Sequence, residues 1–374
     1  MSIQLKDLLI LSSVPGVGPG RLRSLVSHFK TPAAVAQASV KELVLVEGIE
    51  KKTAHTIANF YRDSCPSQYK RYVDDQLSRL NKIDGRTVTF WDKHYPENLK
   101  KIYDPPPVLF LRGSFQEEDK YSIAIVGTRT PTPYGTHLAE KFAAELARYG
   151  IPIISGLARG IDTVAHAATV KSGGRTIAVI GSGIDVIYPP ENKTLVDRIL
   201  PEGAIVSEYV MGTKPDAGNF PRRNRIISGI ALGTLIVETG VDGGAMITAA
   251  TALDQNRDVF AIPAAISEKR SSGTNLLLKQ GKATLVESVD DILSELGPRL
   301  KKLIAPSTTK AEPLPPLSLF EQRLYEALPD DPIHIDALAE RSAMSTGDAL
   351  VHLLSLEFKG IVRQMPGKMF AKLA

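Results

Sequence analysis

Seven short apolar segments between residues 122 and 286 constrain the fold more than any other feature of the sequence. They read SIAIVGT (122–128), IPIIS (151–155), TIAVIG (176–181), AIVSE (204–208), TLIVET (234–239), DVFAI (258–262) and ATLV (283–286), with amphipathic helical stretches between them. Apolar strands that alternate with helices are typical of a parallel sheet covered on both faces. Because right-handed crossovers place helices on each side, the pattern predicts an α/β core with a Rossmann-like, doubly wound, mainly parallel sheet.

The flanks of this core predict a chain of four parts. Residues 1–75 are expected to form a helical domain of the helix-hairpin-helix or SAM-like type, and residues 76–300 the core. Residues 301–317, KKLIAPSTTKAEPLPPL, are rich in Pro, Ser and Thr and lack an apolar period, which predicts a linker. Residues 318–374 show helical spacing followed by a short β-like end, which predicts a winged-helix domain.

Composition narrows the functional classes. The 374 residues are 43% hydrophobic and 23% charged, so disorder along the whole chain is excluded. With 45 Lys and Arg against 41 Asp and Glu, a polyanion must be held by a local basic patch and not by total charge. The one cysteine, Cys65, cannot form an internal disulfide, and no zinc-type Cys/His spacing occurs. We expect a cytoplasmic protein without a cofactor, a metal or a membrane span.

Loops that follow the strands hold the candidate binding residues, because ligands of doubly wound sheets bind beyond the carboxyl ends of the strands. The glycine of the first loop permits a tight turn, and its arginine next to a helix N-terminus suits a phosphate or carboxylate. A strand-to-helix turn with a surface ion pair explains the same residues, and Asp162 could simply cap its helix. The candidates in the first two loops are Gly127, Thr128, Arg129, Ser155, Gly156 and Arg159.

The densest basic feature is FPRRNR, residues 220–225, at the start of an expected helix. Arg222 and Arg225 are three residues apart and share a helix face, whereas Arg223 lies about 100° away. No acidic residue lies among these arginines, which favours contact with a phosphate backbone over a solvated run of charge. Tyr188, Tyr209 and Phe220 are the candidates for base stacking.

The flanking domains also indicate nucleic acid. Residues 14–22 and 46–54 are two copies of the helix-hairpin-helix pattern, whose hairpin offers backbone N–H groups to phosphates. The first copy, with Arg21, matches better, and the second, with Glu47 and Glu50 at its hairpin, could serve only to pack against the first. Residues 318–374 carry six basic and eight acidic side chains, so both DNA contact and protein contact remain open there.

These segments together resemble the DprA/Smf family of bacterial DNA-processing proteins. The resemblance rests on VGTR, SGLARGIDTVAH, GSGIDVIYPPEN, SEY, FPRRNRIISG, ETG followed by GG and ITA, and SSGTNLLLKQGKA, which occur in this order over about residues 85–295. It implies a protein, not an enzyme, that forms a homodimer through its core domain, binds single-stranded DNA and loads the recombinase RecA onto it in natural transformation. The DNA contacts implied for this chain are Gly127, Thr128, Arg129, Asn192, Lys193, Arg222, Arg223 and Arg225.

One alternative comes from a different class. Gly233, Thr234 and Glu238, with the GSGID loop and Arg129, are also similar to nucleotide phosphoribohydrolases of the cytokinin-activating type. In that interpretation Glu238 would be catalytic. The glycine-rich run expected before the glutamate is absent, and the chain contains no G-x-S-x-G elbow and no Walker A motif. The DNA-binding hypothesis therefore accounts for more of the sequence.

Overall fold

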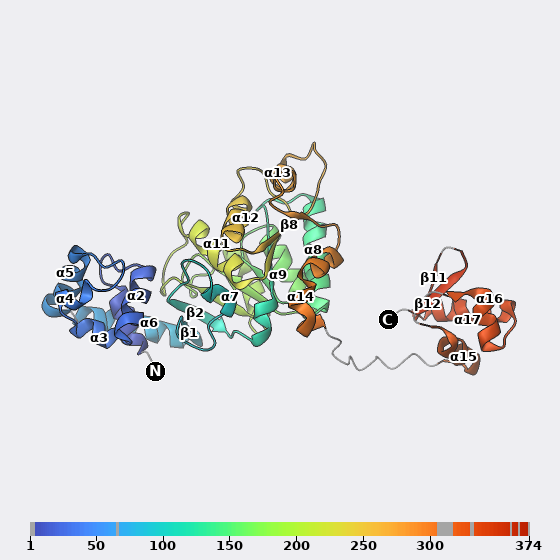
Figure 1. The fold of residues 1–374 in the computed structure, drawn as a ribbon, viewed down its shortest axis with the longest axis horizontal. Coiled ribbons are helices and arrows are strands. Elements are labelled where there is room, and N and C mark those ends of the chain that lie inside the picture. Colours follow the sequence, from blue (N-terminus) through green and yellow to red (C-terminus); the bar gives the residue numbers. More distant parts are fainter. Residues whose placement is uncertain are drawn as a thin grey trace. The chain divides into compact units, whose positions relative to one another are not determined.

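The computed structural model describes residues 4–64, 67–304, 317–329, 333–359, 361–365 and 367–372. It divides into two compact units, Met1–Ala305 and Pro306–Ala374, which are described separately (Figure 1). Cys65 and most of the predicted linker lie outside the described residues. Within the described ranges, none of the helices combines the length and the apolar character that a membrane span needs.

The first unit begins with two consecutive helix-hairpin-helix motifs, as predicted. The turns of both hairpins contain a glycine in the left-handed region, Gly16 with φ +82° and Gly48 with φ +79°, where a side chain would be strained. The capping box of Ser39 and Glu42 opens the first helix of the second motif. The helices are α1 (Leu5–Ser12), α2 (Pro19–Phe29), α3 (Pro32–Gln37), α4 (Val40–Leu43), α5 (Lys51–Asn59), the π-helix η1 (Phe60–Ser64) and α6 (Ser67–Lys82).

The core of this unit is a sheet of nine strands within the described residues, in the order β1-β2-β6-β5-β4-β3-β7-β8-β9. All seven predicted strands are present and pair in parallel, which confirms the predicted fold class. Two further strands, β1 and β2, lie outside the predicted series and add an antiparallel edge next to β6. The strands are β1 (Gly85–Thr89), β2 (Val108–Gly113), β3 (Ile123–Val126), β4 (Ile153–Ser155), β5 (Thr176–Val179), β6 (Ala204–Ser207), β7 (Gly233–Ile236), β8 (Asp258–Ala261) and β9 (Thr284–Leu285).

Helices cover both faces of the sheet because successive strand residues point to opposite sides. Ile123 and Ile125 of β3 pack with α8, α9 and α14, whereas Ala124 and Val126 pack with α11 and α12. The helices and 3-10 turns of the core are α7 (Glu97–Lys100), η2 (Glu117–Tyr121), α8 (Pro133–Arg148), α9 (Ile161–Lys171), η3 (Pro190–Asn192), α10 (Lys193–Ile199), α11 (Asn219–Ile230), α12 (Gly244–Asp254), η4 (Lys269–Ser271), α13 (Ser272–Lys279) and α14 (Val289–Ile304).

The helical part and the sheet share one apolar cluster, which includes Leu8 of α1 and Ile205 of β6. Helix α6 passes through the expected boundary at residues 75 and 76, and its Arg79 pairs with Asp185 at 2.5 Å. Arg23 of α2 pairs with Asp104 at 3.1 Å. The two parts therefore form a single packed unit.

The second unit is a winged helix, as predicted. Its core contains Leu324, Leu338, Leu353 and Phe370, all fully buried. The elements are α15 (Leu319–Ala327), β10 (Ile333–His334), α16 (Ile335–Ser342), α17 (Thr346–Phe358), β11 (Val362–Met365) and β12 (Met369–Lys372), and β12 lies between the other two strands. Helices α16 and α17 form the helix-turn-helix, and β11 and β12 form the wing.

Candidate nucleic-acid interface

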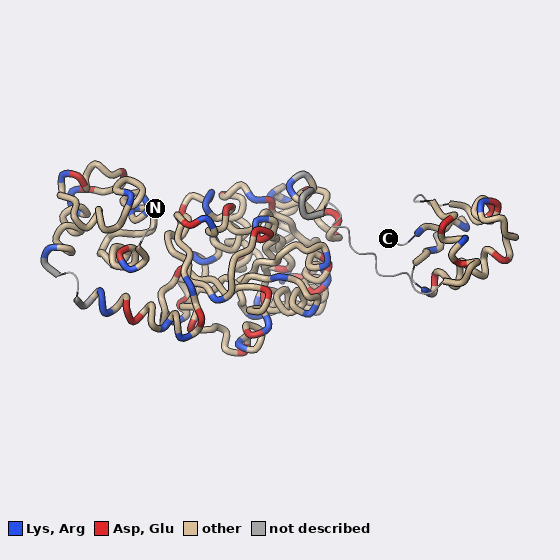
Figure 2. Tube along the Cα trace, turned by 90° about the horizontal axis from the view of Figure 1, so that it is seen from below, with Lys and Arg blue, Asp and Glu red and all other residues tan. Residues whose placement is uncertain are grey.

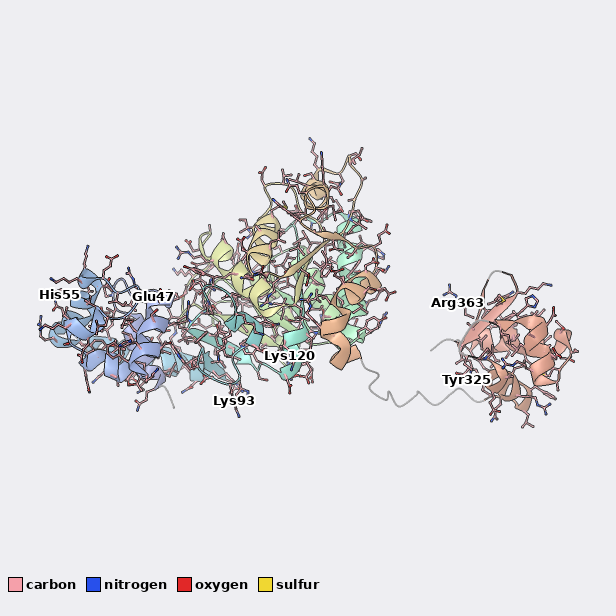
Figure 3. The ribbon with its side chains drawn as sticks, viewed as in Figure 1. Glu47, His55, Lys93, Lys120, Tyr325 and Arg363 are labelled. Atoms are coloured by element: carbon pink, nitrogen blue, oxygen red, sulfur yellow. The ribbon has the colours of Figure 1, made fainter. Side chains whose placement is uncertain are left out.

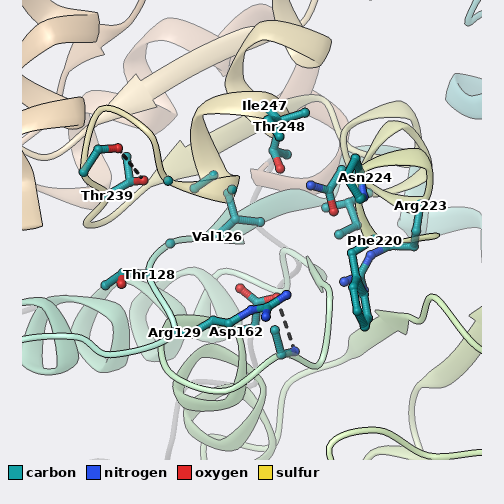
Figure 4. Close-up of a pocket in the computed structure, with 18 of the residues that line it drawn as sticks. Val126, Thr128, Arg129, Asp162, Phe220, Arg223, Asn224, Thr239, Ile247 and Thr248 are labelled. Atoms are coloured by element: carbon teal, nitrogen blue, oxygen red, sulfur yellow. Dashed lines mark hydrogen bonds between the residues drawn. The ribbon is translucent and has the colours of Figure 1, made fainter. Parts of the chain in front are cut away.

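The order of the strands reverses between β3 and β7, so the loops that leave these two strands diverge and open a crevice. A cavity of about 490 Å³ lies there, lined by both loops and by α11 and α12 (Figure 4). A smaller cavity adjoins it beyond the ends of β4 and β5. We call the two cavities together the switch-point groove. Arg129, Ala158, Phe220 and Arg223 line both cavities.

Arginine and aromatic side chains form the wall between the two cavities. The guanidinium of Arg129 lies over the ring of Phe220, 5.3 Å from its centroid, and Arg159 lies 5.9 Å from the ring of Tyr188. The two rings are 5.9 Å apart and tilted by 33°. Among the residues that the structure describes, no acidic side chain pairs with Arg129. The wall therefore offers π-faces together with a positive charge that is available to an anion.

The buried side chain of Arg223 bonds to the backbone beneath the groove. Only 4% of it is exposed, and its Nη1 donates to the carbonyl oxygens of Gly156, at 2.5 Å, and Val179. A Cβ on Gly156 would lie 2.6 Å from that nitrogen, so glycine is required there. Burial lowers the pKa of Arg223 to about 10, which still leaves the side chain charged at neutral pH.

Asp162 provides the negative charge nearest to Arg223. Its carboxylate accepts hydrogen bonds from the backbone N–H groups of Gly156, at 3.1 Å, and Ala158, at 3.4 Å. Burial raises the pKa of Asp162 to about 6, although Arg223 and these hydrogen bonds oppose the rise. Asp162 thus holds the loop after β4 and is not the N-cap residue of α9, because Gly160 occupies that position.

Glycines shape the backbone on two sides of the groove. Gly160 has φ +76°, and a Cβ at this position would lie 2.3 Å from the carbonyl oxygen of Thr128. On the opposite side, α12 begins without a side-chain cap at Gly244, where a Cβ would meet open space. Thr239, Gly240, Gly243 and Gly244 line the large cavity, although the sequence predicted them only as part of a family motif and not as contact residues.

Ser155 and Asn192 are predicted contact residues whose polar side chains bond within the protein. The hydroxyl of Ser155 is fully buried and donates to the carbonyl oxygen of Ile125 at 2.6 Å. The amide of Asn192, a residue that is 4% exposed, donates to the oxygens of Leu157 and Thr163. Both side chains hold the ends of strands and loops in place and do not line either cavity.

The arginines of FPRRNR do not act on one shared path, because the fold supplies acids from distant segments. Arg225 pairs with Glu208 at 2.6 Å and approaches Asp104 at 3.7 Å, away from the groove. The acid that is missing from the sequence around Arg225 is therefore supplied by the fold, and contact of Arg225 with DNA stays a prediction. Arg222 is exposed, as is Lys193 at the start of α10, and neither lines the two cavities. Arg159 pairs with Glu191 at 2.5 Å.

Glu238 is 1% exposed and lies behind the loop, not in the cavity lining. Its Oε2 accepts a hydrogen bond from the backbone N–H of Thr132 at 2.9 Å. A Cβ on Gly135 would lie 2.0 Å from the same oxygen, so the carboxylate packs tightly against the first turn of α8. This position suits a support for the loop and the helix.

In the tandem hairpins, Arg21 joins the two turns. Its Nη1 donates to the carbonyl oxygen of Gly16 at 2.8 Å and its Nε to that of Gly48 at 3.0 Å. Glu47 of the second turn and His55 of α5 are labelled in Figure 3. The side chain of Arg21 therefore links the two motifs, and this contact packs the second hairpin against the first.

Charge of both signs is distributed along the whole chain (Figure 2), so the groove differs from its surroundings by local arrangement and not by total charge. Within the described ranges, no cluster of three His, Cys, Asp or Glu side chains could hold a metal ion. The lining of the groove suits an anionic, partly aromatic ligand.

Comparison with known proteins agrees with each part of the chain. Residues 86–297 match the family model of DNA recombination-mediator protein A, residues 308–368 that of the DprA winged-helix domain, and residues 8–63 that of the SAM-like helix-hairpin-helix tandem. The chain is 34% identical to Protein Smf of Synechocystis, over 97% of this chain and 98% of that protein.

Among the solved structures that resemble the chain, two share at least 30% identity with it. The X-ray structure of DprA from Streptococcus pneumoniae has a TM-score of 0.65 and 32% identity, over 79% of this chain and 99% of that one. The second, of DNA processing protein A from Helicobacter pylori, concerns the single-stranded DNA binding mode of that protein. It has a TM-score of 0.53 and 30% identity, over 58% of this chain and 97% of that one. From these matches and the fold, the chain belongs to the DNA recombination-mediator protein A family, the DprA/Smf DNA-processing proteins.

Proposed function

We propose that the switch-point groove binds single-stranded DNA without sequence preference. The observation that carries the proposal is the wall of Arg129, Phe220, Tyr188 and Arg159 between two adjoining cavities. Aromatic faces stack on any base, and the guanidinium of Arg129 neutralises charge on the strand backbone, so neither reads a sequence. The Helicobacter pylori relative is described as binding single strands, which supports the same role here.

The groove favours single strands over duplex DNA for a physical reason. A cavity of about 490 Å³ has the size of small-molecule sites, so it can admit one or a few nucleotides but not a double helix. Bases in a duplex are stacked and paired, and must leave the stack before an aromatic side chain can reach their faces.

We further propose that the chain, as a homodimer, protects incoming strands and loads the recombinase RecA onto them in natural transformation and homologous recombination. The description of the family as recombination mediators supports this step. A binding role, without catalysis, is consistent with the place of Glu238, whose carboxylate packs under Gly135 and outside the cavity lining. In the phosphoribohydrolase alternative, this same carboxylate would have to reach a substrate.

Fluorescence anisotropy of a labelled oligonucleotide across a salt series tests the DNA contact. Arg129→Ala should lower single-strand affinity and reduce the slope of log affinity against log salt by up to about 0.7, the value for one phosphate contact. The matched control is Arg148→Ala, because exposed Arg148 ends α8 at the far end of the helix from the groove. Equal affinity and slope in Arg129→Ala and Arg148→Ala would contradict the proposal.

RecA loading has a separate measurement. On single strands already coated with single-strand-binding protein, wild type should shorten the lag before RecA assembles. With Arg129→Ala, most of the original lag should remain. If wild type binds the strand normally but does not change the RecA lag, the proposal of RecA loading is rejected. The proposal of DNA binding is unaffected by that result. Release of free base from a nucleoside monophosphate, lost in Glu238→Gln, would instead support the enzyme alternative.

A further inference from the structure

Two polar side chains of the large cavity have no role in the proposed function as it stands. Asn224 of α11 and Thr248 of α12 line this cavity, and Figure 4 shows the amide of the first and the hydroxyl of the second pointing into it. Neither side chain makes a hydrogen bond to another of the residues that the structure describes. Both are therefore placed to bond to a ligand in the cavity.

The burial of Thr248 makes its missing bond informative, because only 2% of this residue is exposed. A helical threonine commonly donates its hydroxyl proton to the carbonyl oxygen four residues earlier, as Thr251 of the same helix does to Ile247 at 2.8 Å. Within the described ranges the hydroxyl of Thr248 has no such bond, and a buried hydroxyl without a partner costs free energy. Since Thr248 lines the cavity, a ligand there can supply the partner.

Apolar side chains lie beside these two polar groups in the lining of the cavity. Val126, Ile227 and Ala245 line it and are buried, and Ile227 follows Asn224 by three residues on the same face of α11. A phosphate alone would leave these apolar side chains without a contact. A nucleobase fits them better, because it has two flat faces that pack against apolar groups and an edge that carries donors and acceptors.

We propose that the large cavity takes one unstacked base of the bound strand, and that the edge of this base bonds to Asn224 and Thr248. The inference rests on the proposed binding of single strands and adds which part of the strand enters the cavity. An amide offers a donor and an acceptor and can turn by 180°, and a hydroxyl both donates and accepts. The pair therefore suits the edge of any base, in agreement with binding without sequence preference. In a duplex this edge is already paired.

Anisotropy with two oligonucleotides of equal length tests the proposal, one intact and one in which abasic sites replace all the bases. Thr248→Val and Asn224→Leu should each lower the affinity for the intact strand by about threefold to tenfold, the effect of one lost hydrogen bond. The salt slope should stay unchanged because no charge is removed. Affinity for the abasic strand should also stay unchanged, because that strand has no base for the cavity.

Thr251→Val is the matched control, since Thr251 lies in the same helix but lines neither cavity. The base contact is rejected if both cavity variants bind the intact strand as tightly as Thr251→Val does, or if they lose as much affinity for the abasic strand as for the intact one. Failure of the proposed function is a different result, in which Arg129→Ala has no effect on either strand.

Thermal unfolding separates a contact with the base from a role in the fold. Because the hydroxyl of Thr248 bonds to none of the described residues, Thr248→Val should keep or raise the Tm of the protein while it weakens strand binding. A Tm below that of wild type would show that the hydroxyl supports the fold, and would overturn the proposal.

Isothermal titration with thymidine monophosphate distinguishes a base of the strand from the base of a free nucleotide. The free nucleotide should bind at least about 100-fold more weakly than the strand, because it lacks the neighbouring phosphates and the contacts of the adjoining cavity. Equal affinity for thymidine monophosphate and for the strand would make a free nucleotide the ligand of this cavity and reject the proposal.

Discussion

At the scale of single residues, the groove depends on a buried pair of opposite charges. Arg223 and Asp162 both contact Gly156, whose missing side chain leaves room for a guanidinium on one side and a carboxylate on the other. Asp162 already compensates the charge of the buried Arg223. The exposed Arg129 is therefore the arginine that can bind an anion. Asp162 is the one acidic side chain among the described residues that line the large cavity.

This arrangement predicts a pH dependence of DNA affinity. The pKa of Asp162 is raised to about 6, so the carboxylate gains its proton as pH falls through that value and the groove loses a negative charge. Single-strand affinity should therefore rise below about pH 6. In Asp162→Asn, affinity at neutral pH should be about threefold to tenfold higher than in wild type, and this step should be absent. Anisotropy titrations at constant ionic strength measure the affinity at neutral pH and the pH step in both proteins. An unchanged pH step in Asp162→Asn would assign it to another group.

At the scale of elements, the groove exists because the loops after β3 and β4 approach each other closely. Gly160 allows this approach, since it combines φ +76° with a separation from Thr128 that no side chain could occupy. The backbone N–H of Ile161 donates to the same carbonyl oxygen of Thr128 at 3.2 Å.

Gly160→Ala should separate these loops and disturb the groove. We expect a loss of about 1–3 kcal/mol of unfolding free energy, because the positive φ and the contact with Thr128 are both violated. Single-strand affinity should fall as well. Gly297→Ala is the control, since a Cβ there meets open space and Gly297 lies in α14, outside the lining of both cavities. Denaturant unfolding and anisotropy on both proteins measure the effects, and equal behaviour of the two variants would refute this account of the loop.

The tandem hairpins provide a second prediction at this scale. Because Arg21 bonds to one carbonyl of each turn, Arg21→Ala should lower the stability of the helical part by about 1 kcal/mol. Lys52→Ala, at an exposed residue of α5, is the control and should leave stability unchanged. Thermal unfolding followed by far-UV circular dichroism separates the variants. A loss of strand affinity without a loss of stability would show that Arg21 contacts DNA instead.

At the scale of the whole molecule, the helical part and the sheet act as one body, and the winged helix is a unit with its own core. A homodimer would bring two switch-point grooves to one strand. Binding at the second groove would then be intramolecular and would add avidity without a new contact.

Oligonucleotide length tests this consequence. Affinity should increase steeply, by about 100-fold or more, once the strand is long enough to reach both grooves, and then level off. A dimer in which one protomer carries Arg129→Ala should lose this step and keep the affinity for short strands. Anisotropy with a series of lengths gives the result. A gradual increase proportional to length, equal in both proteins, would argue against two joined grooves.

The sequence by itself determined the fold class and the order of the parts. The seven apolar segments became the parallel strands, and the hairpin glycines marked two motifs that the structure confirms, because such patterns are local. Strands β1 and β2 escaped prediction because they precede the strand-helix alternation and pair antiparallel at the sheet edge, where β1, GRTVT, has a mostly polar sequence. The candidate loop of Gly127 to Arg129 also followed from sequence, since strand ends in a doubly wound sheet converge on one edge.

Only the tertiary structure decided which side chains could meet a ligand. Ser155, Asn192 and Arg223 look polar and available in the sequence, yet they are buried and bonded to backbone or side-chain oxygens. Arg225 has no acid near it in sequence, but Glu208 and Asp104 reach it from other segments. Patterns of neighbouring residues encode strands and helices, whereas burial and ion pairing depend on residues that are distant in sequence and adjacent only after folding.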